Sequence, residues 1–427
     1  MESEDTALWV ILAALALRTL AEALLNRLNA NRVSSLSKSL PEEVKGLFDE
    51  KTWKKSTDYT LAKSKIGLWE ELYDALLFVP ILAFFMPWAY ELWSGGANAG
   101  PWRETVAVAT ILVLLQIPEL PFEWYKQFRL EERFGFNKST LGLWISDKVK
   151  GTVLGFGLGY GLIGLLLWIY SAFHEVEFWW LWGFGAFFAF QLLLFALWPM
   201  FILPLFNKLE PLEEGVLKDK LMGLADKAGF KAKTIEVMDG SKRSGHSNAF
   251  FTGFGKFRRI VLFDTLIEQL EHDELEAVLA HEIGHYKRGH VPKRLALSAF
   301  FGLASFWLIA YLTKAAWFYE QLGYAGYDEK GLTGPLGPVF LVMAVASGVF
   351  TFWLGPIGNL LSRKHEYEAD AFARDAVGGP ETLVSALRKM YVENLSNPLP
   401  HPLFATVYHS HPTLPEREAA LRGGGVN

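Results

Sequence analysis

The stretch His281-Glu282-Ile283-Gly284-His285 places two imidazoles one helical turn apart, with a carboxylate between them. Side chains at positions i and i+4 of an α-helix lie on the same face, so both histidines can bind one metal ion. Glu282 projects toward the side where an activated water would lie, which is the position of a general base. This pattern on a helix is typical of zinc hydrolases. A solvated helix with two ordinary histidines is the alternative.

The residues before this motif predict a helix that is buried on one side. Asp273 has the character of an N-cap, and Glu276 supplies a carboxylate three residues later. No glycine or proline interrupts the run before Gly284. Apolar residues recur at helical spacing at Leu275, Val278, Leu279 and Ile283. Both histidines are therefore expected on a rigid helix, as a metal site requires.

The composition is that of a membrane protein. Of 427 residues, 51% are hydrophobic and 15% aromatic, which exceeds the apolar share of ordinary soluble domains. Prolines interrupt the second and third apolar runs, whose charge-free stretches are short for a span, and a kinked helix is tolerated where neighbouring helices or water satisfy the freed backbone groups. Seven runs are candidate membrane spans: Leu8–Leu25, Ala75–Tyr90, Val106–Ile117, Val153–Phe173, Phe178–Phe206, Leu295–Tyr311 and Pro335–Leu361. We expect an α-helical protein with seven transmembrane helices.

The distribution of Lys and Arg predicts the orientation. The loops at 94–102 and 174–177 contain neither residue, whereas 26–67, 126–150, 207–294 and the tail after 362 are rich in both. Because cytoplasmic loops retain positive charge, the N-terminus is expected outside and the C-terminus in the cytoplasm, with His281 and His285 on the cytoplasmic side. The net charge of -5 is too small to indicate a charged partner, and we expect no nucleic-acid partner.

The spans divide the chain into four parts: membrane helices at 1–206, a polar segment at 207–294, two further spans at 295–361 and a tail at 362–427. In the polar segment we expect a helix at Leu212–Ala228, a strand at Thr234–Met238, and a hairpin of Ala249–Thr252 with Arg259–Phe263 through Gly253 and Gly255. A strand just before a metal helix can bind an extended peptide at its free edge. Asn248, Ala249 and Phe250 are the candidate edge; a strand paired on both sides, with Asn248 in a turn, is the alternative.

The metal site needs a third protein ligand, because catalytic zinc sites usually combine three ligands with an open position. The chain has no cysteine, so His and carboxylates must supply all of them. His290 misses the spacing of the extended histidine motif and is expected at a helix end or the membrane interface. Glu366 and Asp370 lie at i and i+4 after the last span: Glu366 can bind the metal, and Asp370 can accept a hydrogen bond from a ligating histidine. Glu368 is expected to face solvent.

Together these residues resemble the integral-membrane CAAX prenyl proteases of type 1, zinc metalloproteases related to the enzyme that processes prelamin A. The likeness covers nearly the whole chain, whereas the related four-span quality-control metalloproteases share the zinc motifs and should lack the N-terminal half. The matching stretches are 61–65, 131–140, 204–208, 239–244, 246–250, 261–266, the zinc helix, Ser362 and Arg363 with Glu366 and Asp370, and 410–412.

The resemblance implies a barrel of seven helices around a large water-filled chamber, capped by a small gluzincin-like α/β domain on the cytoplasmic side. Its implied zinc ligands are His281, His285 and Glu366, with Glu282 as general base and one Zn²⁺ per chain. Asp370 would support a ligand, and His411 and Arg417 would face the zinc site and stabilise an oxyanion. A chamber would also explain four ionisable residues in or beside apolar spans, although helix-end positions explain them as well: Arg18, Glu22, Glu119 and Glu123.

The implied reaction is hydrolysis of a peptide that carries an isoprenyl group, with membrane lipid as the surroundings. No lysine-based retrieval signal of the endoplasmic reticulum is present, which favours a bacterial plasma membrane and weakens the case for prenylated substrates. Two alternatives stay open: a broader quality-control endoprotease of the membrane, and a seven-span receptor or transporter in which the histidines are incidental.

Overall fold

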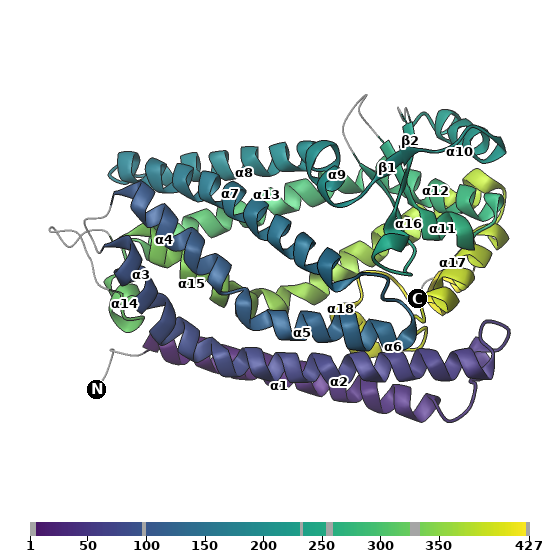
Figure 1. Cartoon of the computed structure of the whole chain (residues 1–427), viewed down its shortest axis with the longest axis horizontal. Coiled ribbons are helices and arrows are strands. Elements are labelled where there is room, and N and C mark those ends of the chain that lie inside the picture. The colour runs from purple at the N-terminus through teal and green to yellow at the C-terminus, as the bar shows by residue number, and fades with distance from the viewer. Residues whose placement is uncertain (1–5, 96–99, 231–233, 253–258, 325–333, 424–427) are drawn as a thin grey trace.

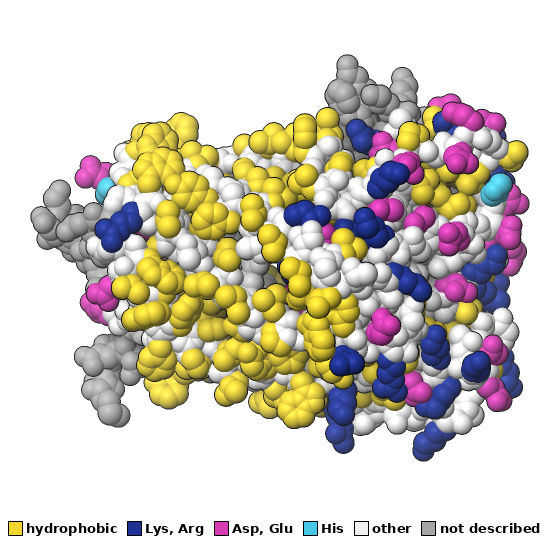
Figure 2. Space-filling view, viewed as in Figure 1, with side chains coloured by type: hydrophobic (Ala, Val, Ile, Leu, Met, Phe, Trp, Pro, Cys, Tyr) yellow, Lys and Arg dark blue, Asp and Glu magenta, His cyan; other side chains and the backbone are white. Residues whose placement is uncertain are grey.

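The computed structural model describes residues 6–95, 100–230, 234–252, 259–324 and 334–423. Within them, seven helical stretches are long and apolar enough to cross a membrane. At most 28% of the residues in their most apolar windows are buried within the protein, so these helices turn most of their apolar side chains outward, as lipid-exposed helices do. Figure 2 shows the apolar surface over the membrane helices and the charged side chains gathered toward the other end. The predicted seven-span helical fold is confirmed.

The helices are longer than the apolar runs that predicted them. Their ends continue into polar sequence, because a helix that leaves the membrane can keep its backbone hydrogen bonds. The first five stretches consist of α1 (Thr6–Leu36), α2 (Glu50–Pro80) with α3 (Met86–Ser94), α4 (Pro101–Leu114) with α5 (Leu120–Tyr125) and α6 (Glu132–Phe134), α7 (Leu141–Phe173), and α8 (Trp179–Leu197) with α9 (Leu203–Phe206). The last two consist of α13 (His290–Leu312), and of α15 (Leu336–Thr351) with α16 (Gly355–Val377). In Figure 1 they run lengthwise along the molecule.

The second and third spans are irregular where their prolines lie. A π-helical turn at Ile81–Phe85 follows Pro80, where the proline lacks the N–H that a regular helix needs. In the third span, a 3₁₀ turn at Ile117–Glu119 contains Pro118, and a second π turn covers Lys126–Glu131. These irregular turns let one span change direction without ending its helix.

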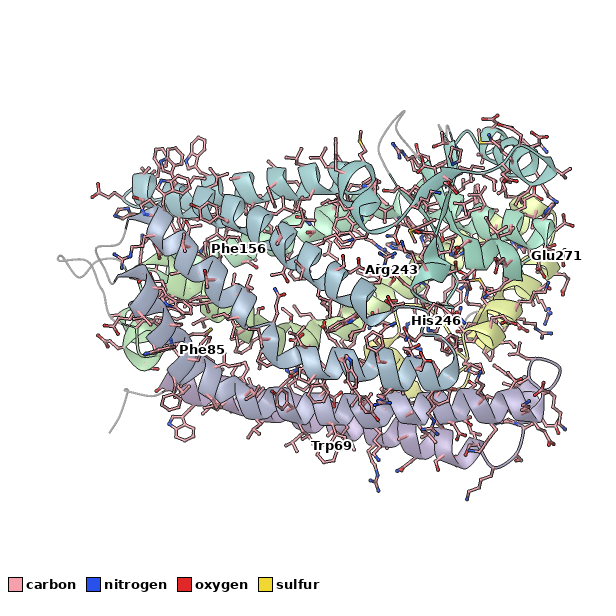
Figure 3. All side chains as sticks on the ribbon, in the orientation of Figure 1. Trp69, Phe85, Phe156, Arg243, His246 and Glu271 are labelled. Atoms are coloured by element: carbon pink, nitrogen blue, oxygen red, sulfur yellow. The ribbon has the colours of Figure 1, made fainter. Side chains whose placement is uncertain are left out.

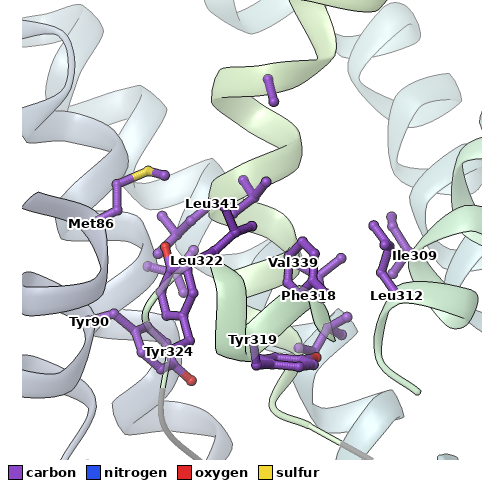
Figure 4. Packing of buried hydrophobic residues seen from close by; sticks show 14 of the residues in the cluster. Met86, Tyr90, Ile309, Leu312, Phe318, Tyr319, Leu322, Tyr324, Val339 and Leu341 are labelled. Atoms are coloured by element: carbon purple, nitrogen blue, oxygen red, sulfur yellow. The ribbon is translucent and has the colours of Figure 1, made fainter. Parts of the chain in front are cut away.

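A hydrophobic cluster holds the membrane helices together at the end remote from the polar domain. Figure 4 shows Met86 and Tyr90 of α3 packed near Leu341 of α15. Leu322 and Tyr324, which follow α14 (Ala316–Gln321), belong to the same cluster. A buried carboxylate fixes the same region: Glu104 of α4 accepts hydrogen bonds of 2.7 Å from the Tyr90 hydroxyl and from the backbone N–H of Gly337. The membrane part therefore has a packed core of its own.

The polar segment forms a four-stranded sheet in the order β1-β2-β4-β3. Its strands are β1 (Leu209–Pro211), β2 (Thr234–Met238), β3 (Ala249–Thr252) and β4 (Arg259–Phe263). β2 runs parallel to β4, and β3 runs antiparallel to β4. Three predicted strands are confirmed and the turn through Gly253 and Gly255 lies outside the described residues. The short β1 was not predicted, because three residues ending in proline carry no periodic signal.

Helices cover this sheet and share one apolar core with it. They are α10 (Val216–Lys227), α11 (Asp264–Gln269), α12 (His272–Lys287), α17 (Glu381–Glu393) and α19 (Leu414–Leu421), while α18 (Pro402–Tyr408) packs on α16 and α1. The boundary expected at 361–362 falls inside α16, because no glycine or proline breaks the helix there. One continuous helix thus leads from the membrane into the polar domain and carries Glu366.

Two cavities lie among the membrane helices beside this domain. The first, of about 400 Å³, is lined by Arg18, Glu22 and Glu119 together with Glu71 and Asp74. The second, of about 440 Å³, shares Glu71 with the first and extends to Tyr408 and His409. Cavities with charged side chains on their walls fit the expected chamber, and three of the four predicted ionisable residues line the first of them. The fourth, Glu123, pairs instead with Lys148 at 2.5 Å.

Candidate metal centre and peptide edge

The helix α12 holds both motif histidines in the core of the polar domain. Its N-cap is Glu271, whose side chain accepts from the third helical residue while Glu274 accepts from the Glu271 backbone N–H at 2.8 Å. The prediction of Asp273 as N-cap was therefore wrong by two residues. Asp273 instead pairs with Lys220 on the surface. A reciprocal pair of caps satisfies two free N–H groups and fixes where the helix begins.

Glu274 also ties α12 to α17, and its loss should destabilise the domain. The carboxylate is 5% exposed and accepts hydrogen bonds from Ser385 at 2.7 Å and Lys389 at 2.8 Å. Burial opposes its ionisation, but the bonds from Lys389 and Ser385 outweigh burial and lower the pKa of Glu274. We expect Glu274→Gln to lose about 1–3 kcal/mol of unfolding free energy at neutral pH. Thermal unfolding of the purified protein measures this loss.

The pH dependence of that loss has a definite sign. Because the folded pKa of Glu274 lies below its unfolded value, the ionised carboxylate contributes stability above the unfolded pKa, and this contribution disappears as the pH falls through the folded pKa. The difference between wild type and Glu274→Gln should therefore shrink in acid. The exposed Asp273→Asn variant is the control and should change stability little at any pH. A difference independent of pH would contradict this account.

A third residue reaches the two histidines because α12 and α16 pack closely. A Cβ atom on Gly284 would lie 3.0 Å from the backbone of Ala369, so the glycine permits this approach. At the crossing, His281 Nε2 lies 3.2 Å from His285 Nε2 and 3.3 Å from Glu366 Oε2. His285 Nε2 lies 3.4 Å from Glu366 Oε1. The structure thus brings together the three residues that the sequence predicts as ligands, with their donor atoms within 4.8 Å of one another.

The donor set fits a metal ion better than it fits a hydrogen-bonded cluster. Glu366 is 2% exposed, and its Oε2 atom has no hydrogen-bond partner among the described residues. The Nε2 atoms of His281 and His285 face each other at 3.2 Å, a distance at which they can share one proton or one metal ion. Burial lowers the pKa of His285 to about 3, so its ring is neutral and can offer a lone pair. Two imidazoles and one carboxylate form a donor set that zinc accepts.

A buried ion pair orients His281. Asp370 Oδ1 lies 2.7 Å from His281 Nδ1, which is the contact expected of a carboxylate that fixes the tautomer of a ligand. Burial opposes protonation of His281, but the nearby carboxylates of Asp370 and Glu366 raise its pKa to about 9. A metal ion at Nε2 therefore has to displace a proton, so metal binding should release protons.

Arg417 binds Asp370 rather than facing the open site. Its Nε and Nη2 atoms donate to the two oxygens of Asp370 at 2.8 and 2.6 Å, and the side chain is buried. Such a bidentate pair fixes the carboxylate in place. Arg417 therefore holds Asp370 beside His281, and the oxyanion contact that the resemblance implies stays a prediction.

The two roles of Arg417 predict different kinetics. Arg417→Lys keeps the charge but cannot form the two-point contact, so we expect about 10–100-fold weaker metal binding and little change in turnover once the site is saturated. Chelator competition gives the metal affinity, and kcat at excess metal gives the turnover. Arg422→Lys, an exposed change just after α19, is the matched control. A reduced kcat with unchanged metal affinity would instead support the oxyanion role of Arg417.

His285 is oriented by a pair that the sequence did not reveal. Its Nδ1 atom lies 2.9 Å from His290 Nδ1, and His290 Nε2 lies 3.0 Å from Glu368 Oε2. Gly289 adopts a left-handed conformation at φ 67°, which ends α12 and lets α13 turn its first residue, His290, back toward the site. His290 does lie at a helix end, as predicted, but it is fully buried there. Glu368, which was predicted to face solvent, is 31% exposed and is also paired with His290.

Glu282 and His411 complete the polar surroundings of the donor atoms. Burial raises the pKa of Glu282 above its usual range, which suits a group that must both accept and return a proton. His411 is largely exposed, and its Nε2 atom lies 3.4 Å from Glu366 Oε1. Its Nδ1 atom contacts the Ser410 hydroxyl at 2.9 Å. His411 is therefore placed where it can meet a bound peptide.

β3 is an edge strand beside this centre. In the described part of the sheet it pairs with β4 on one side and is unpaired on the other, so two-sided pairing was the wrong alternative. β3 also contacts α12. Asn248, exposed at its start, accepts a hydrogen bond from Phe263 N–H through its backbone oxygen at 3.1 Å. Ala249 is buried and Phe250 partly buried, so Asn248 is the most accessible of the three residues.

The loop that leads into β3 is anchored to the membrane helices. His246 contacts Asn394 Oδ1 at 3.0 Å and Glu131 Oε2 at 3.3 Å, and its ring stacks on Phe136 at 4.0 Å. Arg243 binds Asp147 of α7 at 2.8 Å. In Figure 3, Arg243 and His246 lie where the sheet meets the membrane helices. This anchoring, which no motif spacing could reveal, sets the position of the edge relative to the membrane.

Comparisons with known proteins match both halves of the chain. Residues 30–208 match the family described as CAAX prenyl protease N-terminal, five membrane helices, and residues 211–424 match peptidase family M48. CAAX prenyl protease 1 of Saccharomyces cerevisiae is 35% identical over 409 residues, which cover 90% of this chain and 88% of the relative. The human homologue is 32% identical over 437 residues, covering 92% and 90%.

A solved structure gives the same result. The crystal structure of S. mikatae Ste24p superposes with a TM-score of 0.87 at 33% identity, covering 97% of this chain and 98% of that one. The seven-span receptor or transporter with incidental histidines was therefore a wrong alternative. The geometry of the centre and these likenesses agree, and the chain belongs to the CAAX prenyl protease family of multi-pass membrane metallopeptidases.

Proposed function

We propose that the protein is a zinc-dependent endopeptidase that cleaves prenylated peptides near their C-terminus. The observation that carries this proposal is the convergence of His281, His285 and Glu366 on one point, beside a free strand edge, at the end of the membrane helices. The relatives named CAAX prenyl protease 1 support the substrate class. The polar cavities among the membrane helices offer room beside the lipid for a peptide that carries a lipid group.

In this proposal, His281, His285 and Glu366 hold one zinc ion, and Asp370 and His290 orient the two imidazoles. A zinc ion bound there supplies a Lewis acid that makes water nucleophilic at neutral pH and polarises the scissile carbonyl. The free edge of β3 aligns the peptide as an added strand, with Asn248 at the start of that edge. His411 donates a hydrogen bond to the oxygen on which negative charge develops.

Glu282 moves the protons of the reaction. Its carboxylate accepts a proton from the attacking water and then donates it to the leaving amine. The raised pKa of Glu282 favours both transfers, because the carboxylate is a stronger base than an exposed one and its acid form is still able to protonate an amine. No covalent intermediate with the protein is required.

A second candidate is a broader quality-control endopeptidase of the membrane. An edge strand recognises a peptide through main-chain hydrogen bonds, which every sequence offers, and this feature of β3 favours wide specificity. Comparison of a farnesylated peptide with its unmodified twin separates the two candidates. The proposed substrate class predicts a clear preference in kcat/KM for the farnesylated peptide, and equal rates would favour the broader enzyme.

We also propose that the polar domain and the C-terminus lie in the cytoplasm and the N-terminus outside, because Lys and Arg gather in the loops on the side of the domain. The chain has no cysteine, so single introduced cysteines can be labelled unambiguously. A membrane-impermeant maleimide should label Glu175→Cys in intact cells and label Lys242→Cys only after the membrane is opened. The reverse pattern would invert the topology. A bacterial plasma membrane as the location stays a prediction.

A further inference from the structure

A cleft of about 1000 Å³ lies outside the centre described above, between the end of α12, the start of α13 and the middle of α16. We call it the basic cleft, because five cationic side chains line it: Lys287, Arg288, Lys293, Arg363 and Lys364. Two carboxylates, Glu368 and Glu416, line it as well. Five cations against two carboxylates leave a surplus of three positive charges, 5 - 2 = 3. Such a surplus raises the affinity for an anion.

Both carboxylates of the basic cleft already have partners within the protein. Glu416 accepts from Thr413 N–H at 2.7 Å as part of the cap of α19. Glu368 binds His290 at 3.0 Å and lies 4.0 Å from Lys293. The two carboxylates compensate part of the positive charge, and the surplus of three charges remains.

Several of the cationic side chains have N–H donors that are not used in ion pairs or hydrogen bonds among the described residues. Lys287, Arg288 and Lys364 form no ion pair in the part of the chain that the structure describes. The Nε atom of Arg363 is buried without a hydrogen-bond partner among the described residues. Its Nη2 atom donates to Thr406 O at 3.5 Å. A buried guanidinium N–H without a partner is costly, so an acceptor in the cleft would be stabilising.

The basic cleft lies where lipid-facing surface ends. On α16 the residues Ile357, Leu360 and Leu361 stand within two turns of Lys364, and on α13 Leu297, Phe300 and Phe301 follow Lys293 within two turns. All six side chains are between 40 and 65% exposed. Both helices belong to the predicted membrane spans. Two apolar stripes thus lead out of the membrane to one group of cations, as expected at the level of lipid headgroups.

We propose that the basic cleft binds the phosphate-bearing headgroup of one anionic phospholipid, whose acyl chains lie along the apolar stripes of α13 and α16. Lys and Arg form strong, charge-assisted hydrogen bonds with phosphate oxygens. The cations next to lipid-exposed side chains favour a lipid over a soluble anion, because a lipid satisfies the charge and the apolar stripes together. Glu368 lines the cleft and contacts His290, so the headgroup lies close to the residues that orient His285.

The test is lipid binding by the purified full-length protein, measured by native mass spectrometry from detergent. We expect one phosphatidylglycerol molecule to be retained in preference to phosphatidylcholine. The variant K287Q/R288Q/K364Q should bind phosphatidylglycerol about 100-fold more weakly, because each cation near an anionic membrane surface contributes a factor of about five. The control K51Q/K55Q removes two exposed lysines at the start of α2 and should bind as wild type does.

Several results would overturn the proposal. Equal retention of phosphatidylglycerol and phosphatidylcholine by wild type would show that the cleft does not select charge, and this comparison needs no variant. If the control K51Q/K55Q lost as much phosphatidylglycerol binding as the triple variant, the loss would reflect overall charge rather than the basic cleft. Displacement of the lipid by millimolar inorganic phosphate would identify a soluble anion as the ligand. Circular dichroism and metal content verify that the triple variant is folded, and the proposal fails if a folded triple variant binds phosphatidylglycerol normally.

Discussion

Glu282→Gln should retain its metal and lose nearly all peptidase activity. The amide has the size of the carboxylate but cannot accept a proton, so water attack loses its base and the leaving amine loses its acid. General acid–base groups contribute roughly 10²–10⁴-fold to turnover, and Glu282 performs both transfers in the proposed mechanism. We therefore expect kcat to fall by about 10³–10⁴-fold. Hydrolysis of a quenched fluorescent peptide measures the rate, and atomic absorption measures the metal.

The matched control lies on the same helix. Glu276→Gln changes an acid of α12 that binds Lys220 at 3.1 Å on the side away from the donor atoms. It should keep kcat within about twofold, since surface ion pairs contribute little. If Glu282→Gln were as active as wild type with metal bound, Glu282 would not be the base. If its metal content fell as well, the lost activity would reflect the site rather than proton transfer.

Glu366→Gln should abolish both metal binding and activity. The charge of the carboxylate is what balances a divalent ion among two neutral imidazoles, and a neutral amide is a much poorer ligand. Loss of residues that only orient ligands costs about 10–100-fold in metal affinity, so loss of a ligand should exceed 100-fold. Purified variant protein should contain far less than one metal ion per chain. Added zinc should not restore its activity, even at concentrations that restore the activity of chelator-treated wild type.

Asp375→Asn provides the control for Glu366→Gln, because Asp375 is on the same helix, exposed, and paired with its neighbour Arg374. We expect it to bind metal and turn over peptide as wild type does. Wild type treated with a strong chelator should lose activity and recover it with zinc. Full metal content in Glu366→Gln would move the third ligand elsewhere, and His411, 3.4 Å from Glu366, would become the first residue to examine.

Local sequence patterns were sufficient for most of the elements and for proposing the three ligands. Apolar runs identified the seven spans, because lipid requires long helices with satisfied backbones. Alternation and turn residues gave β2, β3 and β4 with the observed bounds. The i and i+4 spacings selected His281 with His285, and Glu366 with Asp370, since such pairs share a helix face. These signals depend on near neighbours in the chain, so they can be read without the fold.

The sequence by itself therefore determined the membrane class, the proposed donor residues of the centre and the helix that carries each of them. Only the tertiary structure decided which groups meet across the chain. It placed Arg417 on Asp370, paired His290 with Glu368, and gathered five cations at the basic cleft. The physical reason is that side-chain contacts between distant segments depend on how helices pack, as where Gly284 lets α16 approach α12, and no local period records that distance.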